Sequence, residues 1–598
     1  MIKVSDFIFK YLHEKYDINH VFLVTGGGAM HLNDSIGHTE GLSYTCNHHE
    51  QASAIAAEGY YRASGNLCIT NVTTGPGGTN TITGVLGQWC DSIPAIYISG
   101  QVKQSTTISA CPDLDLRQLG DQEVDIVSIV KSITKYAVMV TDPLDIKYYL
   151  DKCIYTATSG RPGPVWLDVP LDIQGAMIEE SELRKFDEPQ EFTDKLLEKQ
   201  VDDLLRKILQ AKSPVIYVGN GVRLADKVDE FISLAEYLNI PVVTAISGSD
   251  IIWHDHPLFF GKPGICGDRI GNIMVQNSDL LIILGTRLSI RQISYAYDLF
   301  APKAYKVMID IDSAELNKPT LNIDLKINAD MRNFIPLITR KMREFGTSDF
   351  EKWIEWGRAC ESKLPTLFDD NPSQNGYISS YVFVHKLFER LKSGDVVITG
   401  NGTAYTSTYQ AMKVNKGVRV FANQGCAAMG YDLPAAIGAC LSNKNGRTIL
   451  ITGDGSFQMN IQELQTVVTY NLPLKIFVLE NEGYLAIKTT QKSFFNGNFV
   501  GSNPSSGVVC PDLEKIAMAY GIPFKRLNQE KTLSDELSQI LDLPGMLICE
   551  ITMNPEQTLY PKSASFMDEN GNMSSAPLEK MAPFMDDDIQ NICVYKCS

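Results

Sequence analysis

The chain has 598 residues, of which 44% are hydrophobic and 21% are charged, a composition typical of soluble globular proteins. This length predicts about three to five domains. The formal net charge is −17 and no basic run offsets it, which excludes general attraction to nucleic acids or anionic membranes. No signal peptide pattern opens the chain, and no apolar run reaches the roughly 18 residues of a membrane span. The thirteen cysteines form no Cys-x-x-Cys pair, so we expect reduced thiols and a cytoplasmic protein.

Short apolar runs rich in β-branched residues alternate with amphipathic helical patterns along most of the chain. Strands that are apolar on both faces belong in parallel sheets covered by helices. Such runs are too numerous for one ordinary sheet, and so we predict an α/β fold of doubly wound parallel sheets. The runs are 67–72, 94–99, 164–169, 214–218, 241–246, 279–284, 305–311, 395–399, 447–452 and 474–479.

Two charged, polar interruptions, at 179–200 and 348–376, are typical of linkers, and the second is partly helical in pattern. They separate three α/β domains and leave a tail that is short of strand signals and rich in Met, Pro and Ser. The predicted bounds of the domains and the tail are 1–175, 190–345, 372–555 and 556–598.

Gly453-Asp454-Gly455 directly follows the run at 447–452, and Asn481 comes soon after the run at 474–479. A helical pattern lies between the two runs, so Asp454 and Asn481 should emerge at the carboxyl ends of parallel strands, where open α/β sheets bind ligands. A carboxylate, an amide oxygen and a main-chain carbonyl are hard ligands that suit Mg²⁺ bound to a diphosphate. Alone, Gly-Asp-Gly is usually a turn with a helix-capping aspartate, but Asn481 at this spacing favours the metal site.

This arrangement resembles the signature of the thiamine diphosphate (ThDP) enzymes, Gly-Asp-Gly followed by Asn-Asn. Glu480 stands where that family has its first asparagine, Asn481 matches the metal-binding asparagine, and the carbonyl ligand would come from Gly483. Longer segments resemble the acetolactate synthase branch and extend the likeness over nearly the whole chain. The resemblance implies a pyrimidine-binding, a central FAD-type and a diphosphate-binding domain in that order. The longer segments are 48–65, 73–102 and 422–439.

Glu50 matches the catalytic glutamate of that family. The thiazolium carbon must lose a proton, and the aminopyrimidine ring can accept it when a carboxylic acid drives its tautomerisation, through a charge-assisted hydrogen bond. Outside this context, a glutamate in a first helical turn is explained by the helix dipole alone; the neighbouring Gln51 and the Gly75-Pro76-Gly77 turn favour the catalytic role. The resemblance also implies that Glu50 of one subunit faces the diphosphate site of another, and hence a homodimer or homotetramer.

The same resemblance implies the rest of the cofactor site, with Asp454, Asn481 and Gly483 as metal ligands. Met429 would support the bent cofactor, although an ordinary core methionine explains it equally well. Gly400 to Thr403 would form a second diphosphate-binding turn of backbone N–H groups. The residues expected to bind ThDP are Gly27, Glu50, Pro76, Asn80, Gly400, Asn401, Gly402, Thr403, Gly425, Met429, Gly453, Asp454, Gly455, Ser456, Asn481, Gly483, Tyr484 and Leu485.

A flavin site is implied for the central domain. The glycine turn at 219–221 is a weak signal alone, but four neighbouring segments resemble the FAD-binding stretches of acetolactate synthases: 159–170, 259–267, 283–291 and 308–316. The alternative is a domain that keeps the fold without the ligand, and Ile290 replaces a family aspartate. By position, the residues expected at FAD are Arg161, Gly219, Arg287, Arg291, Asp310 and Asp330.

The resemblance implies that pyruvate loses carbon dioxide and that the remaining two-carbon unit attacks a second carbonyl. Gln122 and Lys135 fall where the family has pocket residues near the substrate, and Gln122 is predicted as a catalytic residue. An ordinary polar side chain in contact with solvent explains either residue equally well. On the acceptor side Asp121, Leu171, Thr490 and Ala486 replace phenylalanine, lysine, tryptophan and methionine of the family. These changes widen and wet the pocket, so an acceptor with hydroxyls, such as a nucleotide-linked keto-sugar, becomes plausible.

Three alternatives stay open from the sequence. Acetolactate synthase proper would use a second pyruvate as the acceptor. A pyruvate oxidase or simple decarboxylase would reduce a dye or release acetaldehyde. A non-catalytic flavin- or nucleotide-binding homologue would have lost Glu50, Asp454 or Asn481, and all three are present.

Overall fold

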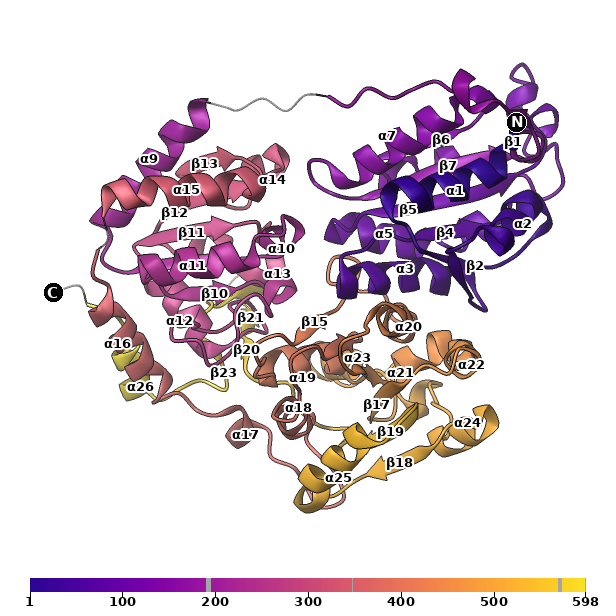
Figure 1. The fold of residues 1–598 in the computed structure, drawn as a ribbon. Coiled ribbons are helices and arrows are strands. Elements are labelled where there is room, and N and C mark those ends of the chain that lie inside the picture. The colour runs from indigo at the N-terminus through magenta and orange to yellow at the C-terminus, as the bar shows by residue number, and fades with distance from the viewer. Residues whose placement is uncertain (190–194, 347, 568–572, 597–598) are drawn as a thin grey trace.

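The computed structural model describes residues 1–189, 195–346, 348–567 and 573–596. It contains three parallel sheets, each covered by helices on both faces (Figure 1), which confirms the predicted fold class. All ten apolar runs form strands. The edge strands β3 (Ser43–Cys46), β6 (Tyr136–Met139), β13 (Leu325–Asn328) and β18 (Phe524–Leu527) lie outside those runs and are less buried, and a half-covered strand needs fewer apolar residues. The edge strand β15 (Arg419–Phe421) and the buried strand β2 (His20–Leu23) also lie outside the runs.

The N-terminal sheet has the order β3-β2-β4-β5-β7-β6. His49 caps its helix α3 by accepting a hydrogen bond from the Gln51 N–H, and Gly65 ends that helix in the left-handed region. The strands are β2 (His20–Leu23), β3 (Ser43–Cys46), β4 (Ile69–Val72), β5 (Ala95–Gln101), β6 (Tyr136–Met139) and β7 (Pro164–Pro170), beside a β1–β8 pair (Ile2–Lys3, Met177–Ile178). The helices are α1 (Val4–Tyr16), α2 (Met30–His38), α3 (Glu50–Ser64), α4 (Pro76–Thr79), α5 (Ile82–Asp91), α6 (Ile126–Val130), α7 (Ile146–Thr158) and α8 (Leu171–Gln174).

The central sheet has the order β10-β9-β11-β12-β13. Along β11, Ile282 packs into one hydrophobic core while Leu281 and Ile283 pack into the other, as a strand with helices on both faces requires. The strands are β9 (Pro214–Val218), β10 (Val242–Thr244), β11 (Leu280–Leu284), β12 (Tyr305–Asp310) and β13 (Leu325–Asn328). The helices are α9 (Lys195–Gln210), α10 (Gly221–Leu224), α11 (Val228–Leu238), α12 (Arg269–Asn277), α13 (Ile290–Ile293), α14 (Ser313–Asn317), α15 (Met331–Phe345) and α16 (Glu351–Glu361).

The C-terminal sheet has the order β15-β14-β16-β17-β19-β18. Ile449 and Ile451 of β16 face one core and Leu450 faces the other. The strands are β14 (Val396–Thr399), β15 (Arg419–Phe421), β16 (Thr448–Gly453), β17 (Leu474–Glu480), β18 (Phe524–Leu527) and β19 (Leu547–Thr552). The helices are α17 (Leu367–Asp370), α18 (Ser380–Phe388), α19 (Thr403–Ala411), α20 (Asp432–Ser442), α21 (Asp454–Phe457), η9 (Gln458–Glu463), α22 (Leu464–Thr469), α23 (Leu485–Phe494), α24 (Leu513–Tyr520) and α25 (Glu530–Asp542).

The N-terminal and C-terminal domains pack together through α3 and α20, which lie side by side in Figure 1. The backbones touch at two glycines. A Cβ on Gly59 would lie 2.0 Å from the Ala435 carbonyl oxygen, and one on Gly438 would lie 1.8 Å from the Ala56 carbonyl oxygen. Only glycine fits such an approach, so this contact fixes how the two domains meet.

The tail folds back onto the central domain, beside α16 in Figure 1. It forms β20 (Lys562–Ser563) paired with β23 (Met581–Ala582), β21 (Ser565–Met567) paired with β22 (Met573–Ser575), and α26 (Asp587–Ile592). Leu578 and Cys593 join the central core, and Asn272 of α12 donates hydrogen bonds to the Leu578 carbonyl and the Met581 sulfur. The tail therefore completes the central domain.

The three sheets fall within the three predicted ranges, while the domain bounds themselves stay predictions. The predicted linker 179–200 includes residues 190–194, which lie outside the described residues. Among the described residues, the cysteines are all free, as expected of reduced thiols, and no helix is both long and apolar enough to cross a bilayer.

Candidate active site

Two neighbouring strand ends of the C-terminal sheet carry the predicted metal ligands. β16 and β17 are parallel, and Gly453 pairs with Leu479 in their register. Asp454 follows Gly453 at once, and Asn481 follows the last residue of β17. The two side chains therefore lie at the same carboxyl edge of the sheet, as the βαβ pattern predicts.

Asp454 is held in place by the backbone around it. It is 3% exposed, and its Oδ2 accepts hydrogen bonds from the N–H groups of Gly483 at 2.9 Å and Asn481 at 3.3 Å. Its Oδ1 accepts one from the Gly455 N–H at 2.8 Å. Burial raises the pKa of Asp454 to about 6, against the lowering effect of these donors. A cation beside the carboxylate would offset that burial penalty.

Asn481 provides the observation that tests the site. Its side chain is 3% exposed, and its Oδ1 is buried without a hydrogen-bond partner in the structure. An unpaired buried acceptor costs roughly 1–3 kcal/mol, and an oxygen beside a carboxylate is a ligand that a hard cation prefers. The donor set at this edge therefore fits Mg²⁺.

The glycine turns around this edge leave backbone uncovered. A Cβ on Gly453 or Gly402 would meet nothing within 4 Å. Gly455, by contrast, lies under the Tyr484 ring, since its Cβ would come 2.3 Å from the ring edge. The open backbone at Gly402 and Gly453 can accept a phosphate close to the N-termini of α19 and α21.

The remaining residues predicted for the diphosphate side gather at the same edge. Asn401 donates a hydrogen bond to the Ala428 carbonyl, and Ser456 accepts one from the Gly430 N–H at 2.9 Å. These bonds tie the turn that follows β14 and the segment before α20 to the sheet edge that carries Asp454 and Asn481, which we call the metal edge below. Met429 lies in that segment and is 41% exposed, so it is not part of the core in this chain.

A second cluster forms at the carboxyl edge of the N-terminal sheet. Glu50 opens α3, and its Oε2 accepts a hydrogen bond from the Asn80 amide at 2.9 Å. Gln122 adopts a left-handed conformation with φ of 61° and lies against the Pro76 turn, because a Cβ on Gly75 would come 2.1 Å from the Gln122 carbonyl. The structure thus brings Glu50, Asn80 and the Gln122 turn to one edge.

Gly27 lies at this edge too, whereas Lys135 does not. Gly28, the next residue, donates its N–H to Thr73, which follows β4. The Lys135 N–H bonds to the Pro164 carbonyl at the opposite, amino end of β7, and its Nζ donates to the Ser159 carbonyl at 2.6 Å. Burial lowers the pKa of Lys135 to about 8. Within one chain, Lys135 and Gln122 therefore lie at opposite ends of the sheet, and a place for Lys135 near the substrate stays a prediction.

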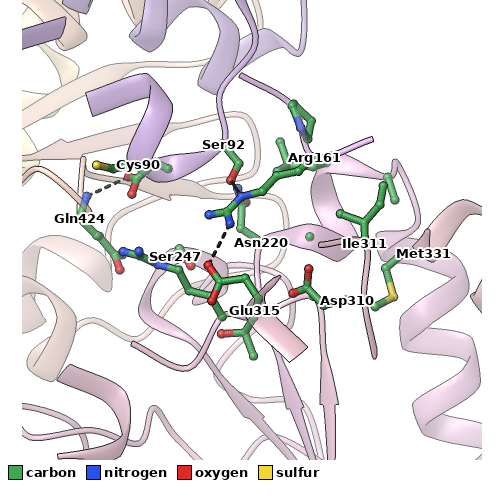
Figure 2. A pocket seen from close by; sticks show the side chains of 18 of the residues that line it. Cys90, Ser92, Arg161, Asn220, Ser247, Asp310, Ile311, Glu315, Met331 and Gln424 are labelled. Carbon is green, nitrogen blue, oxygen red and sulfur yellow. Dashed lines mark hydrogen bonds and ion pairs between the residues drawn. The ribbon is translucent and has the colours of Figure 1, made fainter. Parts of the chain in front are cut away.

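A cavity lies where the three domains meet (Figure 2). It encloses about 150 Å³, and about 1180 Å³ when the open solvent at its mouth is included. Five of the six residues predicted for the flavin line it, and Gly219 directly precedes its lining residue Asn220. A Cβ on Gly219 would come 2.4 Å from Thr286, so a side chain there would close this wall. The five are Arg161, Arg287, Arg291, Asp310 and Asp330.

The cavity wall presents both unpaired and paired polar groups. Asn220 Oδ1 and Gln424 Nε2 are buried without a partner. Arg161, by contrast, bonds Asp312 and Glu315 at 2.9 Å each, and Figure 2 shows the bond to Glu315. Burial raises the pKa of Asp310 to about 6. The unpaired amides show that the cavity suits a ligand with both acceptors and donors.

Comparison with known proteins agrees with this geometry. Residues 2–129, 201–338 and 400–551 match the N-terminal TPP binding, central and C-terminal TPP binding domains of thiamine pyrophosphate enzymes. The acetolactate synthase large subunit of Cyanidium caldarium is 30% identical over 94% of this chain and 95% of its own length. That of Lactococcus lactis is 30% identical over 90% and 91%, and the chloroplastic enzyme of Arabidopsis thaliana 30% over 92% and 81%. The chain belongs to the acetolactate synthase-like ThDP enzymes.

This class decarboxylates 2-keto acids in carboligation, so the chain is an enzyme that uses ThDP. In this ThDP enzyme the acceptor-side substitutions lie in two places. Ala486 and Thr490 are one turn apart on α23, and Thr490 is exposed and donates to the Ala486 carbonyl at 3.1 Å. Asp121 is exposed beside Gln122, and Leu171 opens α8.

A buried charge network between the two cofactor domains was missed from the sequence. Glu58 is 1% exposed, and Arg62 donates to it at 2.7 Å and to Asp91 at 2.6 Å. Asp91 accepts the N–H groups of Gln424 and Gly425 at 2.9 and 2.8 Å. The network therefore fixes the segment around Gly425. The spacing of Glu58 and Arg62 along α3 fits an ion pair, but nothing in the sequence places Asp91 beside them.

Removing the centre of this network should destabilise the protein. We expect Arg62→Met to cost about 3–5 kcal/mol, because it leaves Glu58 and Asp91 buried without their cation. Burial already raises the pKa of Glu58, and a group with a raised folded pKa contributes stability at low pH that is lost as the pH rises. The difference in free energy of unfolding between Arg62→Met and the wild type should therefore become smaller as the pH falls from about 8 towards 4.5, the ordinary pKa of glutamate. Thermal unfolding midpoints across that range measure it.

Arg206→Met is the matched control. Arg206 is 59% exposed in its ion pair with Asp203, and such pairs contribute about 0–1 kcal/mol. An equal loss of stability in both variants, or a gap for Arg62→Met that widens towards low pH, would contradict the role assigned to the network.

Proposed function

We propose that this enzyme decarboxylates pyruvate with ThDP and Mg²⁺ and transfers the two-carbon unit to a carbonyl acceptor. The observation that carries the proposal is the unpaired, buried Asn481 Oδ1 beside the backbone-held carboxylate of Asp454. These two oxygens, with the Gly483 carbonyl, would hold the magnesium ion. The open backbone at Gly402 and Gly453 would accept the diphosphate.

When bound, ThDP supplies a nucleophilic carbon and an electron sink for the decarboxylation of a 2-keto acid. Glu50 would exchange a proton between its Oε atoms and the pyrimidine ring, and Asn80 would orient that carboxyl through its hydrogen bond. Gln122, beside the Pro76 turn, would contact the substrate. Gly27, Pro76, Asn80 and Glu50 come from one sheet edge, and the remaining proposed ThDP residues come from another.

Because Glu50 and Asp454 lie at the edges of sheets in different domains, the site needs an arrangement that joins the two edges. We propose a homodimer or homotetramer in which Glu50 of one subunit meets the metal edge of another. This assembly follows the family resemblance, and the mixing experiment below tests it.

FAD is the ligand we propose for the cavity between the domains. The cavity has a wide mouth, brings together arginines and carboxylates, and presents the unpaired amides of Asn220 and Gln424. Arg287 and Arg291 would contact the diphosphate of FAD, and Asp310 and Asp330 the hydroxyls of its ribose and ribityl chain. Because Arg161 is already paired with Asp312 and Glu315, it would contribute at most part of its guanidinium.

The acceptor we propose is a nucleotide-linked keto-sugar. On α23, Thr490 is exposed and Ala486 is half-buried. The family resemblance implies large apolar residues at both positions. A wider, more polar acceptor side can pair the hydroxyls of a sugar, which a hydrophobic pocket leaves unsatisfied. A second pyruvate, giving acetolactate, is the alternative acceptor, because the compared relatives are named acetolactate synthases.

The cofactor ligands can be tested by binding alone. Asn481→Leu removes the unpaired oxygen and should leave the stability of the protein without cofactor unchanged or higher, because no hydrogen bond to that atom is lost. The rise in thermal midpoint that Mg²⁺ and ThDP give the wild type should disappear in this variant.

Mass spectrometry of the denatured wild type should also detect flavin. A full thermal shift in Asn481→Leu would contradict the metal ligand, and absence of flavin after reconstitution with FAD would contradict the flavin site.

Glu50→Gln should reduce carbon dioxide release from pyruvate by about 10²–10⁴-fold without unfolding the protein, because general acid–base catalysis contributes that much. Glu40→Gln, an exposed glutamate of the same domain, should keep full activity. Mixing inactive Glu50→Gln with inactive Asp454→Asn under subunit exchange should restore activity, since a mixed dimer has one intact site. Full activity of Glu50→Gln would contradict its role, and mixtures without recovery would contradict a shared site.

Product analysis tests the acceptor. The protein is incubated with pyruvate, ThDP and Mg²⁺, with and without a CDP-linked keto-sugar, and products are identified by mass spectrometry. We expect a sugar enlarged by two carbons only when the keto-sugar is present. Acetolactate alone in both reactions would exclude the sugar acceptor, and acetaldehyde alone or dye reduction would favour a decarboxylase or an oxidase.

A further inference from the structure

A second cavity lies where the chain enters the C-terminal domain, before α18, and outside the proposed cofactor site. Its volume is about 230 Å³. The segment between α17 and α18 forms one wall, and the segment after β19 forms the other. Nine of its eleven lining residues carry polar side chains, whereas ligand pockets are usually mostly apolar. Its chemistry therefore indicates a polar ligand.

Two buried polar atoms in this wall have no partner. Asn371 and Ser379 are each 3% exposed, and Asn371 Oδ1 and Ser379 Oγ form no hydrogen bond in the structure. The orientation of the Asn371 amide is fixed, because its Nδ2 donates to the Leu367 and Tyr560 carbonyls at 3.0 Å each. Both residues line the cavity, so an acceptor and a hydroxyl of its wall are left unsatisfied.

The charges around the cavity are already balanced. Asp370 pairs with Arg269 at 3.2 Å. Glu556 pairs with Lys488 and Lys492 of α23, and these lysines lower its pKa. Because both carboxylates have cationic partners, the cavity does not call for a cation. It suits a neutral ligand.

Three further carboxamides line the cavity and are partly bonded already. Asn554 donates to Gln374 Oε1 at 2.7 Å and accepts the Glu556 N–H, and Gln557 bonds both the hydroxyl and the N–H of Ser380. Since each amide nitrogen has two N–H groups, donors remain for a hydroxyl. Tyr377 adds an aromatic ring that is 36% exposed. The volume of about 230 Å³ is below the roughly 300 Å³ of pockets for drug-sized ligands. A ligand of monosaccharide size fits both observations.

We propose that this cavity binds a small neutral polyhydroxylated compound, a sugar or polyol, through Asn371 and Ser379. The proposal does not depend on which acceptor the reaction uses. The wall is joined to the metal edge, because the Met553 N–H bonds to the Glu480 carbonyl at 2.9 Å and Glu556 pairs with α23. The hydroxyls can come from a free sugar or from the sugar of a nucleotide-sugar, and the experiment separates these sources.

The test is ligand-observed NMR titration of the full-length protein with ThDP and Mg²⁺ present. The probes are D-glucose, myo-inositol, CDP-glucose and CDP. We expect at least one hydroxylated probe to bind the wild type, and Ser379→Ala to weaken that binding about two- to tenfold, the contribution of one neutral hydrogen bond. Since Ser379 Oγ has no partner, Ser379→Ala should not lower the thermal midpoint without ligand.

Thr244→Val is the matched control. Thr244 is fully buried on β10, its hydroxyl is also unpartnered, and it lines neither cavity. This variant should bind the probe as the wild type does. Binding of a free sugar or polyol identifies a free ligand, and binding of CDP-glucose but not of CDP or glucose identifies a nucleotide-sugar.

Three outcomes would overturn the proposal: no probe binds, CDP binds as tightly as CDP-glucose with no free sugar bound, or Ser379→Ala binds the probe as the wild type does. Carbon dioxide release from pyruvate, measured on the same samples, reports separately on the proposed function. Ser379→Ala should leave that release unchanged, so loss of sugar binding and failure of the decarboxylase assignment are distinguishable.

Discussion

The parallel pairing of β16 with β17 is the constraint on which the site depends. It places Asp454 and Asn481 at one edge, and the turn after β17 then supplies backbone N–H groups to the Asp454 carboxylate. The carboxylate is thereby fixed before any ligand arrives, and Asn481 Oδ1 is left with no internal partner. A site organised in this way has already met the cost of ordering its ligands, which favours tight binding of a metal diphosphate.

The second constraint is the contact between α3 and α20, where Gly59 and Gly438 let two backbones touch. Glu50 opens α3, so the helix that carries the proposed catalytic carboxyl is anchored on the C-terminal domain of its own chain. The Arg62 network continues this anchor to the Gly425 segment. The start of α3 cannot move without disturbing this contact. The orientation of Glu50 therefore depends on how the two domains pack.

The sequence predicted the features that repeat or that follow strand ends. Apolar runs marked most of the central strands but not β2, and the order strand, helix, strand was enough to bring Asp454 next to Asn481. The spacing of Glu58 and Arg62 fits an ion pair along one helix, but nothing in the sequence places Asp91 or the Gly425 segment beside them. Position in a family pattern does not say at which end of a sheet a residue lies, and Lys135 lies at the amino end of β6. The polar cavity escaped notice because its two walls, near Ser379 and Glu556, are far apart in the sequence.

Helix α23 links the two functional proposals. It begins after the Asn481 turn, carries Ala486 and Thr490, and is tied at Lys488 and Lys492 to Glu556. The wall of the polar cavity is therefore ion-paired to the helix that carries Ala486 and Thr490, and a ligand in that cavity would lie beside the same helix. Since the ion pairs with Glu556 are partly exposed, they fix the direction of α23 more than they stabilise it. Under the proposed acceptor assignment, the small residues at 486 and 490 would widen the pocket while these ion pairs keep the helix in place.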